Sequence, residues 1–256
     1  MVAEQDKRED SVAQGSALPE ARRLDYLKAM GIQPWFEKYP VMIDAKEQAG
    51  GTTMPAAEPV IEKVAEETGR PQLSAMDCEQ LRALVSDCQL CGLHTSRTRT
   101  VFGEGHRDAE LFIISDAPTG EEESKGQPGV GEPGLLLDAM LAAIGLKRQQ
   151  VYMANVIKCR PPDDRTPQTS EIICCDAYLQ RQIELIRPKV ILVLGQLAAQ
   201  HLLVTQDPLL TLRATTHQYN GIPLLVSHPP AHLITHSRDK KDSWQDLLRV
   251  KQLLVN

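Results

Sequence analysis

The 256-residue chain contains no run of about eighteen apolar residues and no charged-then-apolar segment at its start. We therefore expect a cytoplasmic protein with no membrane contact. Basic residues are not in surplus either, since 28 Lys and Arg stand against 34 Asp and Glu and give a net charge of -6. Proteins whose main role is to bind DNA phosphates usually carry more Lys and Arg than Asp and Glu. The charge balance therefore argues weakly against DNA binding as the primary role.

Six cysteines are present, and the spacing of four of them organises the chain. Cys88 and Cys91 form a Cys-x-x-Cys pair, whose sulfurs a tight turn can direct at one metal centre. Cys159 and Cys175 are separated by fifteen residues and can supply a second pair of thiolates. In a cytoplasmic chain this pattern favours zinc or an iron–sulfur cluster over disulfides. The alternative is that these are ordinary buried cysteines.

Short apolar runs alternate with amphipathic segments from about Ser74 onward. Expected strands cover 111–114, 151–157, 190–194 and 224–227, and expected helices cover 135–144, 171–186, 197–203 and 242–254. This alternation predicts an α/β fold, a three-layer α/β/α sandwich around a central parallel sheet. In such a sheet the active site lies at the carboxyl ends of the strands.

The chain ahead of this body divides by composition into three parts. Residues 1–19 are polar and are expected to be disordered, and residues 41–73 have the composition of a linker. Between them, residues 20–40 form an apolar island in which Leu24, Leu27 and Met30 stand at helical spacing. We expect a flexible arm with a short helix there, joined to a domain at 74–256. The alternative is that the island packs against that domain.

Four stretches of the body resemble the iron–sulfur uracil-DNA glycosylases, and the resemblance runs in order over about residues 75–256. The stretches are 99–105, 151–162, 188–195 and 227–231. The resemblance implies a uracil-DNA glycosylase-like fold and a [4Fe–4S] cluster held by Cys88, Cys91, Cys159 and Cys175. Cys174 neighbours the fourth ligand, but the spacing favours Cys175. Cys78 has no counterpart in the family and is expected to be a core residue.

The chain departs from that family where the flipped base would sit. The family's Gly-Glu-Ala-Pro-Gly is replaced by Ser115-Asp116-Ala117-Pro118-Thr119, and its stacking Phe by Gly129. Thr119 introduces a β-branched side chain where only backbone should lie, and losing base–aromatic stacking costs about 1–3 kcal/mol per base. We therefore expect a filled pocket without a stacking platform, in which Asp116, Asn155 and His228 are vestigial. The alternative is that Asn155 and His228 still act, with Asp116 orienting a water.

The apolar island has a resemblance of its own. It looks like the amino-terminal segment of the psi subunit of bacterial DNA polymerase III holoenzyme. That resemblance implies docking onto the collar subunits of the clamp loader, with the chi subunit as a further partner and single-strand binding protein as an indirect one. The implied partner-binding residues are Arg22, Arg23, Leu24, Leu27, Met30, Ile32, Trp35 and Phe36.

Three functional hypotheses follow from these patterns. The favoured one is a non-catalytic, psi-like subunit that bridges the clamp loader to chi through the arm and uses a degenerate glycosylase fold as its body. The second is an active uracil-DNA glycosylase of base-excision repair. The third is an iron–sulfur protein with an unassigned binding role.

Overall fold

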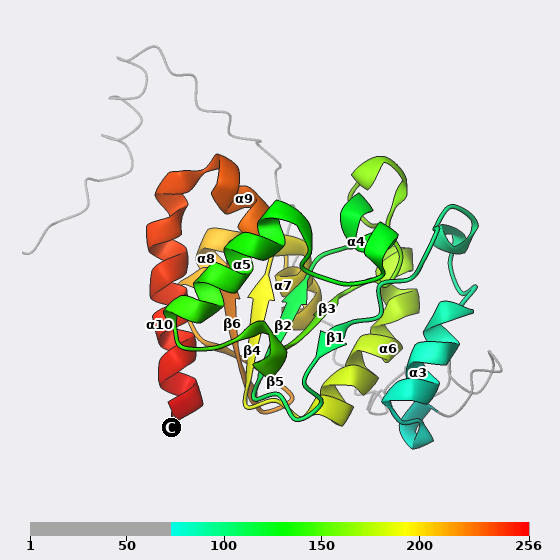
Figure 1. Cartoon of the computed structure of the whole chain (residues 1–256), viewed down its shortest axis with the longest axis horizontal. Helices are drawn as coiled ribbons and strands as arrows, with labels where there is room; N and C mark the ends of the chain where they lie inside the picture. Colours follow the sequence, from blue (N-terminus) through cyan, green and yellow to red (C-terminus); the bar gives the residue numbers. More distant parts are fainter. Residues whose placement is uncertain (1–72, 256) are drawn as a thin grey trace, which may run out of the picture. The chain divides into compact units, whose positions relative to one another are not determined.

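A computed structural model of the protein describes residues 73–255 (Figure 1). The predicted disordered segment 1–19, the docking arm 20–40 and nearly all of the linker 41–73 lie outside the described residues. The arm's docking role and its partner-binding residues therefore stay predictions.

A six-stranded sheet forms the centre of the described residues, in the order β1-β3-β2-β4-β6-β5. The strands are β1 (Glu104–Gly105), β2 (Leu111–Ser115), β3 (Tyr152–Asn155), β4 (Val190–Leu194), β5 (His217–Tyr219) and β6 (Ile222–Ser227). β3, β2, β4 and β6 run parallel to one another. The two short edge strands pair antiparallel, β1 with β3 and β5 with β6.

The α-helices follow the strands in the alternating pattern expected from the sequence. They are α3 (Cys78–Ser86), α4 (Gly120–Lys125), α5 (Gly131–Ala143), α6 (Thr169–Ile186), α7 (Gln196–Leu203), α8 (Leu209–Arg213), α9 (Pro230–Thr235) and α10 (Lys240–Val255). Short 3-10 turns lie at Leu73–Ala75, Gly92–Thr95, Arg148–Gln150, Pro162–Asp164 and Ser237–Asp239.

The parallel strands are buried on both faces, and successive side chains supply two separate cores. On one face, residues such as Phe112 and Val193 pack against α6 and α7. On the other, residues such as Ile113 and Leu192 pack against α5 and α10. Figure 1 shows α5 and α10 together at one side of the sheet. α3 adds a third, smaller cluster, in which Cys78 is buried as predicted.

The predicted three-layer sandwich with its central parallel sheet is thus confirmed. The two edge strands were not predicted from the sequence, although one of them carries a strong local signal. β5 and β6 form a hairpin joined by Asn220 and Gly221, which both have positive φ, 48° and 81°. An Asn-Gly pair is the preferred sequence for such a two-residue turn, because both positions need the left-handed region.

No helix in the described part of the chain is long and apolar enough to cross a bilayer.

A buried charge network joins α8 to α10. Asp246, 1% exposed, accepts hydrogen bonds from Arg213 at 2.9 Å and is also paired with Arg249. Arg213 is itself buried. The Arg213 guanidinium, at the end of α8, is therefore held inside the fold.

Replacing Asp246 by Ala should lower the free energy of unfolding by about 3–5 kcal/mol, because it leaves the Arg213 cation buried without its main partner. Asp242 offers a matched control, since it lies 3.8 Å from the same guanidinium but is half exposed. Asp242→Ala should cost less than about 1 kcal/mol. Thermal unfolding followed by circular dichroism measures both, and equal losses would contradict this assignment.

Candidate functional site

The register of the parallel strands brings four residues into one row at the carboxyl edge of the sheet. Asn155 pairs with Ser115, Ser115 with Leu194, and Leu194 with Ser227. Neighbouring strands lie about 4.8 Å apart, so Asn155 and the β6 end are separated by roughly 14 Å. His228 follows Ser227 directly. Two of the predicted site residues therefore stand at the two ends of one row.

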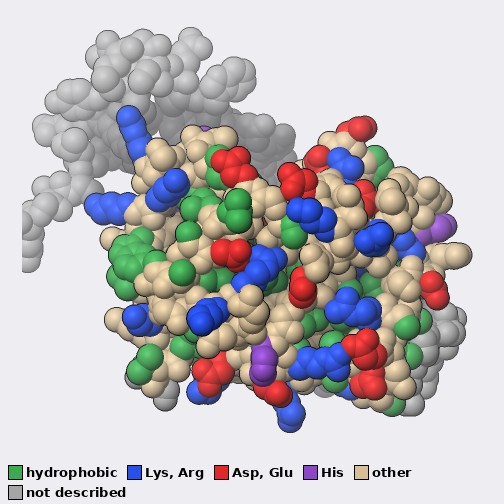
Figure 2. Space-filling model, viewed as in Figure 1, with side chains coloured by type: hydrophobic (Ala, Val, Ile, Leu, Met, Phe, Trp, Pro, Cys, Tyr) green, Lys and Arg blue, Asp and Glu red, His purple; other side chains and the backbone are tan. Residues whose placement is uncertain are grey.

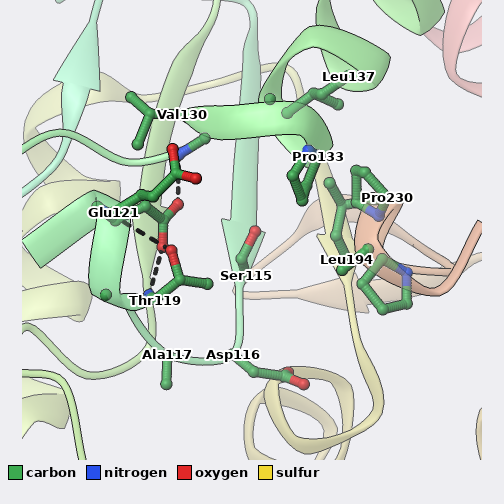
Figure 3. Close-up of a pocket in the computed structure, with 16 residues that line it drawn as sticks. Ser115, Asp116, Ala117, Thr119, Glu121, Val130, Pro133, Leu137, Leu194 and Pro230 are labelled. Carbon is green, nitrogen blue, oxygen red and sulfur yellow. Dashed lines mark hydrogen bonds between the residues drawn. The ribbon is translucent and has the colours of Figure 1, made fainter. Parts of the chain in front are cut away.

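A cavity of about 360 Å³ opens over this row (Figure 3). Its wall is mostly apolar and comes from the β2 loop, α4, the start of α5, the end of β4 and the start of α9. The lining residues are Ser115, Asp116, Ala117, Thr119, Gly120, Glu121, Glu122, Gly129, Val130, Pro133, Gly134, Leu137, Leu194, Pro229, Pro230 and Ala231. The expectation of a filled pocket is therefore wrong.

Thr119 does not block the cavity, because its side chain serves as the N-cap of α4. Its hydroxyl accepts from the backbone N–H of Glu122 at 3.4 Å, while the Glu122 carboxylate accepts from the Thr119 N–H at 2.8 Å. The backbone of Thr119 is extended, with φ -85°, so a β-branched residue is not strained there.

Glu122 ties two walls of the cavity together. Besides Thr119, its carboxylate accepts a hydrogen bond from the backbone N–H of Gly129, which precedes α5. The side chain is buried, and burial raises its pKa. Glu122 was not among the predicted site residues. Its spacing from Thr119, Thr119-x-x-Glu122, has the form of a capping box and could have indicated it.

Gly129 stands where the related family has its stacking Phe. Its φ is +63°, and an added Cβ would lie 3.3 Å from the Arg148 guanidinium, which donates to the Gly129 carbonyl at 2.7 Å. A larger residue would be strained in this backbone conformation. The missing stacking platform is therefore confirmed at this position, and prolines and leucines supply the cavity wall instead.

Asp116 turns away from the centre of the cavity, toward the start of α7 (Figure 3). Its Oδ1 accepts from the backbone N–H of Ala198 at 2.8 Å. Burial raises the pKa of this carboxyl to about 6, and the backbone hydrogen bonds only partly offset that effect. Gly195 makes the close approach possible, since a Cβ there would lie 2.4 Å from the carboxylate oxygens.

Asn155 and His228 lie behind the cavity wall and carry polar atoms with no hydrogen bond. Asn155 is 1% exposed and His228 is 5% exposed. Nδ2 of Asn155 lies near the Glu122 carboxylate without meeting hydrogen-bond geometry. Both ring nitrogens of His228 also lack a partner among the described residues. Burial and the Arg213 charge lower the pKa of His228, so the imidazole is neutral at pH 7.

The four predicted cluster cysteines come from three segments. Cys88 and Cys91 follow α3, Cys159 follows β3, and Cys175 lies on α6. Their thiolates interact electrostatically: Cys159 with Cys88 and Cys91, and Cys175 with Cys159 and Cys91. Burial is the largest cause that raises the pKa of Cys175, to about 12, and the neighbouring cysteines contribute to that shift. These cysteines can therefore ionise together only with a cation bound between them.

The spacing of the sulfurs distinguishes the two kinds of centre. A single tetrahedral zinc ion bound at 2.3 Å would set its sulfurs about 3.8 Å apart. Among the described residues, no three cysteine sulfurs lie within 4.8 Å of one another. The donor set therefore fits a larger polynuclear cluster better than one zinc ion.

Two basic side chains lie near these cysteines, and an anionic cluster would favour their charged forms. Burial alone lowers the pKa of Lys158, to about 7, and the neighbouring thiolates oppose that shift. Arg97 donates to the Cys159 sulfur at 3.3 Å. Lys158 is fully buried and donates to the Asn155 carbonyl at 2.7 Å, so it links the cysteines to the cavity edge. Cys174 instead directs its thiol to the Leu90 carbonyl at 3.2 Å.

The fold and this site define a class of DNA-repair protein. The family model of the uracil DNA glycosylase superfamily matches residues 102–248, and the chain belongs to that superfamily. Within it, the chain is similar to the type-4 uracil-DNA glycosylase of Saccharolobus solfataricus, with 36% identity over 179 residues, 66% of this chain and 83% of the relative. That coverage places the chain in the type-4 family.

Two further type-4 uracil-DNA glycosylases are more similar over shorter stretches. The Archaeoglobus fulgidus protein is 48% identical over 116 residues, 45% of this chain and 58% of the relative. The Thermotoga maritima protein is 43% identical over 124 residues, 47% of this chain and 65% of the relative. The matched regions thus span less than two thirds of these two relatives.

These comparisons correct the favoured functional hypothesis. The prediction of a non-catalytic, psi-like subunit is wrong, because the curated relatives are uracil-DNA glycosylases at 36% to 48% identity. The prediction that the chain is not an enzyme fails with it. The inference failed physically at Thr119, whose side chain caps a helix instead of occupying the pocket. The predicted cofactor, a [4Fe–4S] cluster, is confirmed, since type-4 enzymes carry one and the cysteines are present.

Asp116→Asn should make stability less sensitive to pH. The folded pKa of Asp116 is about 6, above its ordinary value of 3.8. Between these values the native state holds more protons than the unfolded state, so this residue's stabilising contribution is lost as pH rises through 6. From pH 5 to pH 8 the wild type should therefore lose about 1–1.5 kcal/mol relative to the variant.

Thermal unfolding of both proteins at several pH values measures this difference. Taking the difference between the two proteins cancels the titration of all other groups. A difference that stays constant with pH would show that Asp116 titrates normally.

Proposed function

We propose that the protein hydrolyses the N-glycosidic bond of deoxyuridine in DNA, as a uracil-DNA glycosylase. The observation that carries this proposal is the open cavity over the carboxyl edge of the sheet. Beneath it, Nδ2 of Asn155 and the ring nitrogens of His228, near the two ends of the row of strand-end residues, have no hydrogen-bond partner among the described residues. The family relationship supports the same activity. A DNA substrate accords with the predicted cytoplasmic location, which stays a prediction.

Uracil must leave the base stack to reach such a cavity. The uracil edge offers a carbonyl oxygen and an N–H side by side, and the side-chain amide of Asn155 can donate to the first and accept from the second. Cytosine presents the opposite pattern at these two atoms, so a fixed amide rejects it. The buried Nδ2 of Asn155 supplies the donor for this contact.

Hydrolysis breaks the C1′–N1 bond, and uracil departs with the bonding electron pair. Water forms the new bond to C1′, and its proton reaches the uracil nitrogen through solvent. The ring gains negative charge as the bond breaks, so an N–H donor aimed at a ring carbonyl stabilises the transition state. A neutral His228 still carries one such N–H. The Asp116 carboxylate is bound to α7 and acts as a positioning group.

The face of the described residues seen in Figure 2 carries no broad basic patch for DNA to bind. Figure 2 shows Lys and Arg interspersed with Asp and Glu over the face in view. We infer that backbone contacts to DNA come from a few local cations near the cavity, and that affinity depends mainly on the flipped base.

Cys88, Cys91, Cys159 and Cys175 are proposed as the ligands of the [4Fe–4S] cluster. These cysteines come from the end of α3, the loop after β3 and α6, so a cluster held by them would join the three segments. Its negative charge would lie beside Lys158, which donates to the carbonyl of Asn155. The cluster is therefore proposed to have a structural role and to fix the position of Asn155, which hydrogen-bonds the base.

Cluster-loaded wild-type protein should release uracil from single- and double-stranded oligonucleotides. His228→Ala should lower the rate about 10²–10³-fold, because it removes a donor aimed at developing charge. Asn155→Ala should lower it comparably, whereas His106→Ala, an exposed histidine on β1's side of the sheet, should leave it unchanged. Mass spectrometry of released uracil measures each rate. No release by the loaded wild-type protein would overturn the proposal.

Cys175→Ser should abolish the broad visible absorption of the cluster, while Cys174→Ser should retain it. The difference is expected because Cys175 interacts with both Cys159 and Cys91, whereas Cys174 interacts with Cys91 but donates its thiol to the Leu90 carbonyl. Visible spectra and iron and sulfide analysis of anaerobically purified proteins measure the outcome. The reverse result would move the fourth ligand to Cys174.

A further inference from the structure

Three histidines follow β6 at intervals of four residues and stack on one another. The rings of His228 and His232 have centroids 4.9 Å apart and planes inclined by 13°. Those of His232 and His236 are 4.2 Å apart and inclined by 4°. His232 lies on α9, while His228 precedes the helix and His236 follows it, so α9 positions the middle of this column.

Asp239 adds a carboxylate to the column. Its Oδ2 lies 2.6 Å from Nε2 of His232. One ligand atom from each of His228, His232 and Asp239 lies within 4.8 Å of the other two. The remaining ring, His236, has its Nδ1 beside Thr235 and lies outside this group.

His228 provides an independent indication of a ligand. Its side chain is 5% exposed, and both its nitrogens lack a hydrogen bond among the described residues. A buried imidazole without partners costs free energy, and a bound ion or substrate would recover it. The nearby Arg213 cation is itself neutralised by Asp246 at 2.9 Å, which leaves Asp239 to balance a metal ion.

We propose that His228, His232 and Asp239 form a binding site for a divalent transition-metal ion, and that its occupation inhibits the enzyme. Two imidazoles and one carboxylate suit Zn²⁺ and its neighbours, whereas Mg²⁺ and Ca²⁺ prefer oxygen ligands. Tetrahedral Zn²⁺ would set its nitrogen and oxygen ligands about 3.3 Å apart. Small side-chain movements reach that spacing, with the ion replacing the His232–Asp239 hydrogen bond and a water completing the shell.

The inhibitory part rests on the proposed function. A neutral His228 that ligates the metal through one ring nitrogen keeps its N–H on the other nitrogen. Ligation fixes the ring toward His232 and Asp239, so this N–H can no longer be aimed at the departing base. Because that contact stabilises the transition state, Zn²⁺ should lower kcat for uracil release.

Calorimetric titration of the anaerobic, cluster-loaded protein with Zn²⁺ tests the site without reference to catalysis. We expect one bound equivalent, with the visible spectrum of the cluster unchanged. His232→Gln and Asp239→Asn should each weaken binding about 10–100-fold or more. The matched control is His201→Gln, since His201 forms a similar histidine–carboxylate pair with Asp176 at 2.7 Å but has no second imidazole in reach.

Uracil release at increasing Zn²⁺, with and without a chelator, supplies the second readout. Inhibition should be strong and reversible in the wild type and in His201→Gln, and weak in the other two variants. Binding that is absent in the wild type, or unaffected by His232→Gln and Asp239→Asn, overturns the site. Binding without any inhibition of an active enzyme overturns the regulatory part. A protein that binds Zn²⁺ at this site but releases no uracil refutes the proposed function and leaves the metal site intact.

Discussion

The structure depends on the register of four parallel strands. Because β3, β2, β4 and β6 end in line, Asn155, Ser115, Leu194 and Ser227 form one row, although they come from widely separated parts of the chain. Parallel pairing requires helical crossovers, and those helices bury both faces of the sheet. The carboxyl edge is then the one place where polar groups from several strands meet.

Backbone hydrogen bonds from helix starts keep that edge open. Thr119 and Glu122 cap α4 reciprocally, and Asp116 is bound to α7. These three polar side chains are engaged in hydrogen bonds to the backbone, and the cavity wall is largely apolar. Cys159 follows β3, at the end of the row away from β6 and α9, and Lys158 connects it to Asn155.

Much of this arrangement could be predicted. The apolar runs at 111–114 and 190–194 and the helices at 171–186 and 197–203 are strong local signals, because burial on both faces leaves a strand no polar positions. The cysteine spacing indicated a metal centre, and the motifs singled out Asn155 and His228, although as vestigial residues. Whether the pocket is open or filled could not be predicted. Whether Thr119 enters the cavity depends on its rotamer and on a partner three residues away, and the substitution alone does not reveal either.

The sequence by itself determined the order of the helices and strands, the class of fold and the cysteine spacing that indicates a metal centre. These follow from local periodicity and from residue chemistry. Only the tertiary structure decided that the cavity is open, that Asp116 accepts a hydrogen bond from the backbone of α7, and that His228, His232 and Asp239 lie together. Each of these depends on distances between side chains from different elements. Such distances are set by how helices pack across the sheet, and no periodicity in the sequence records them.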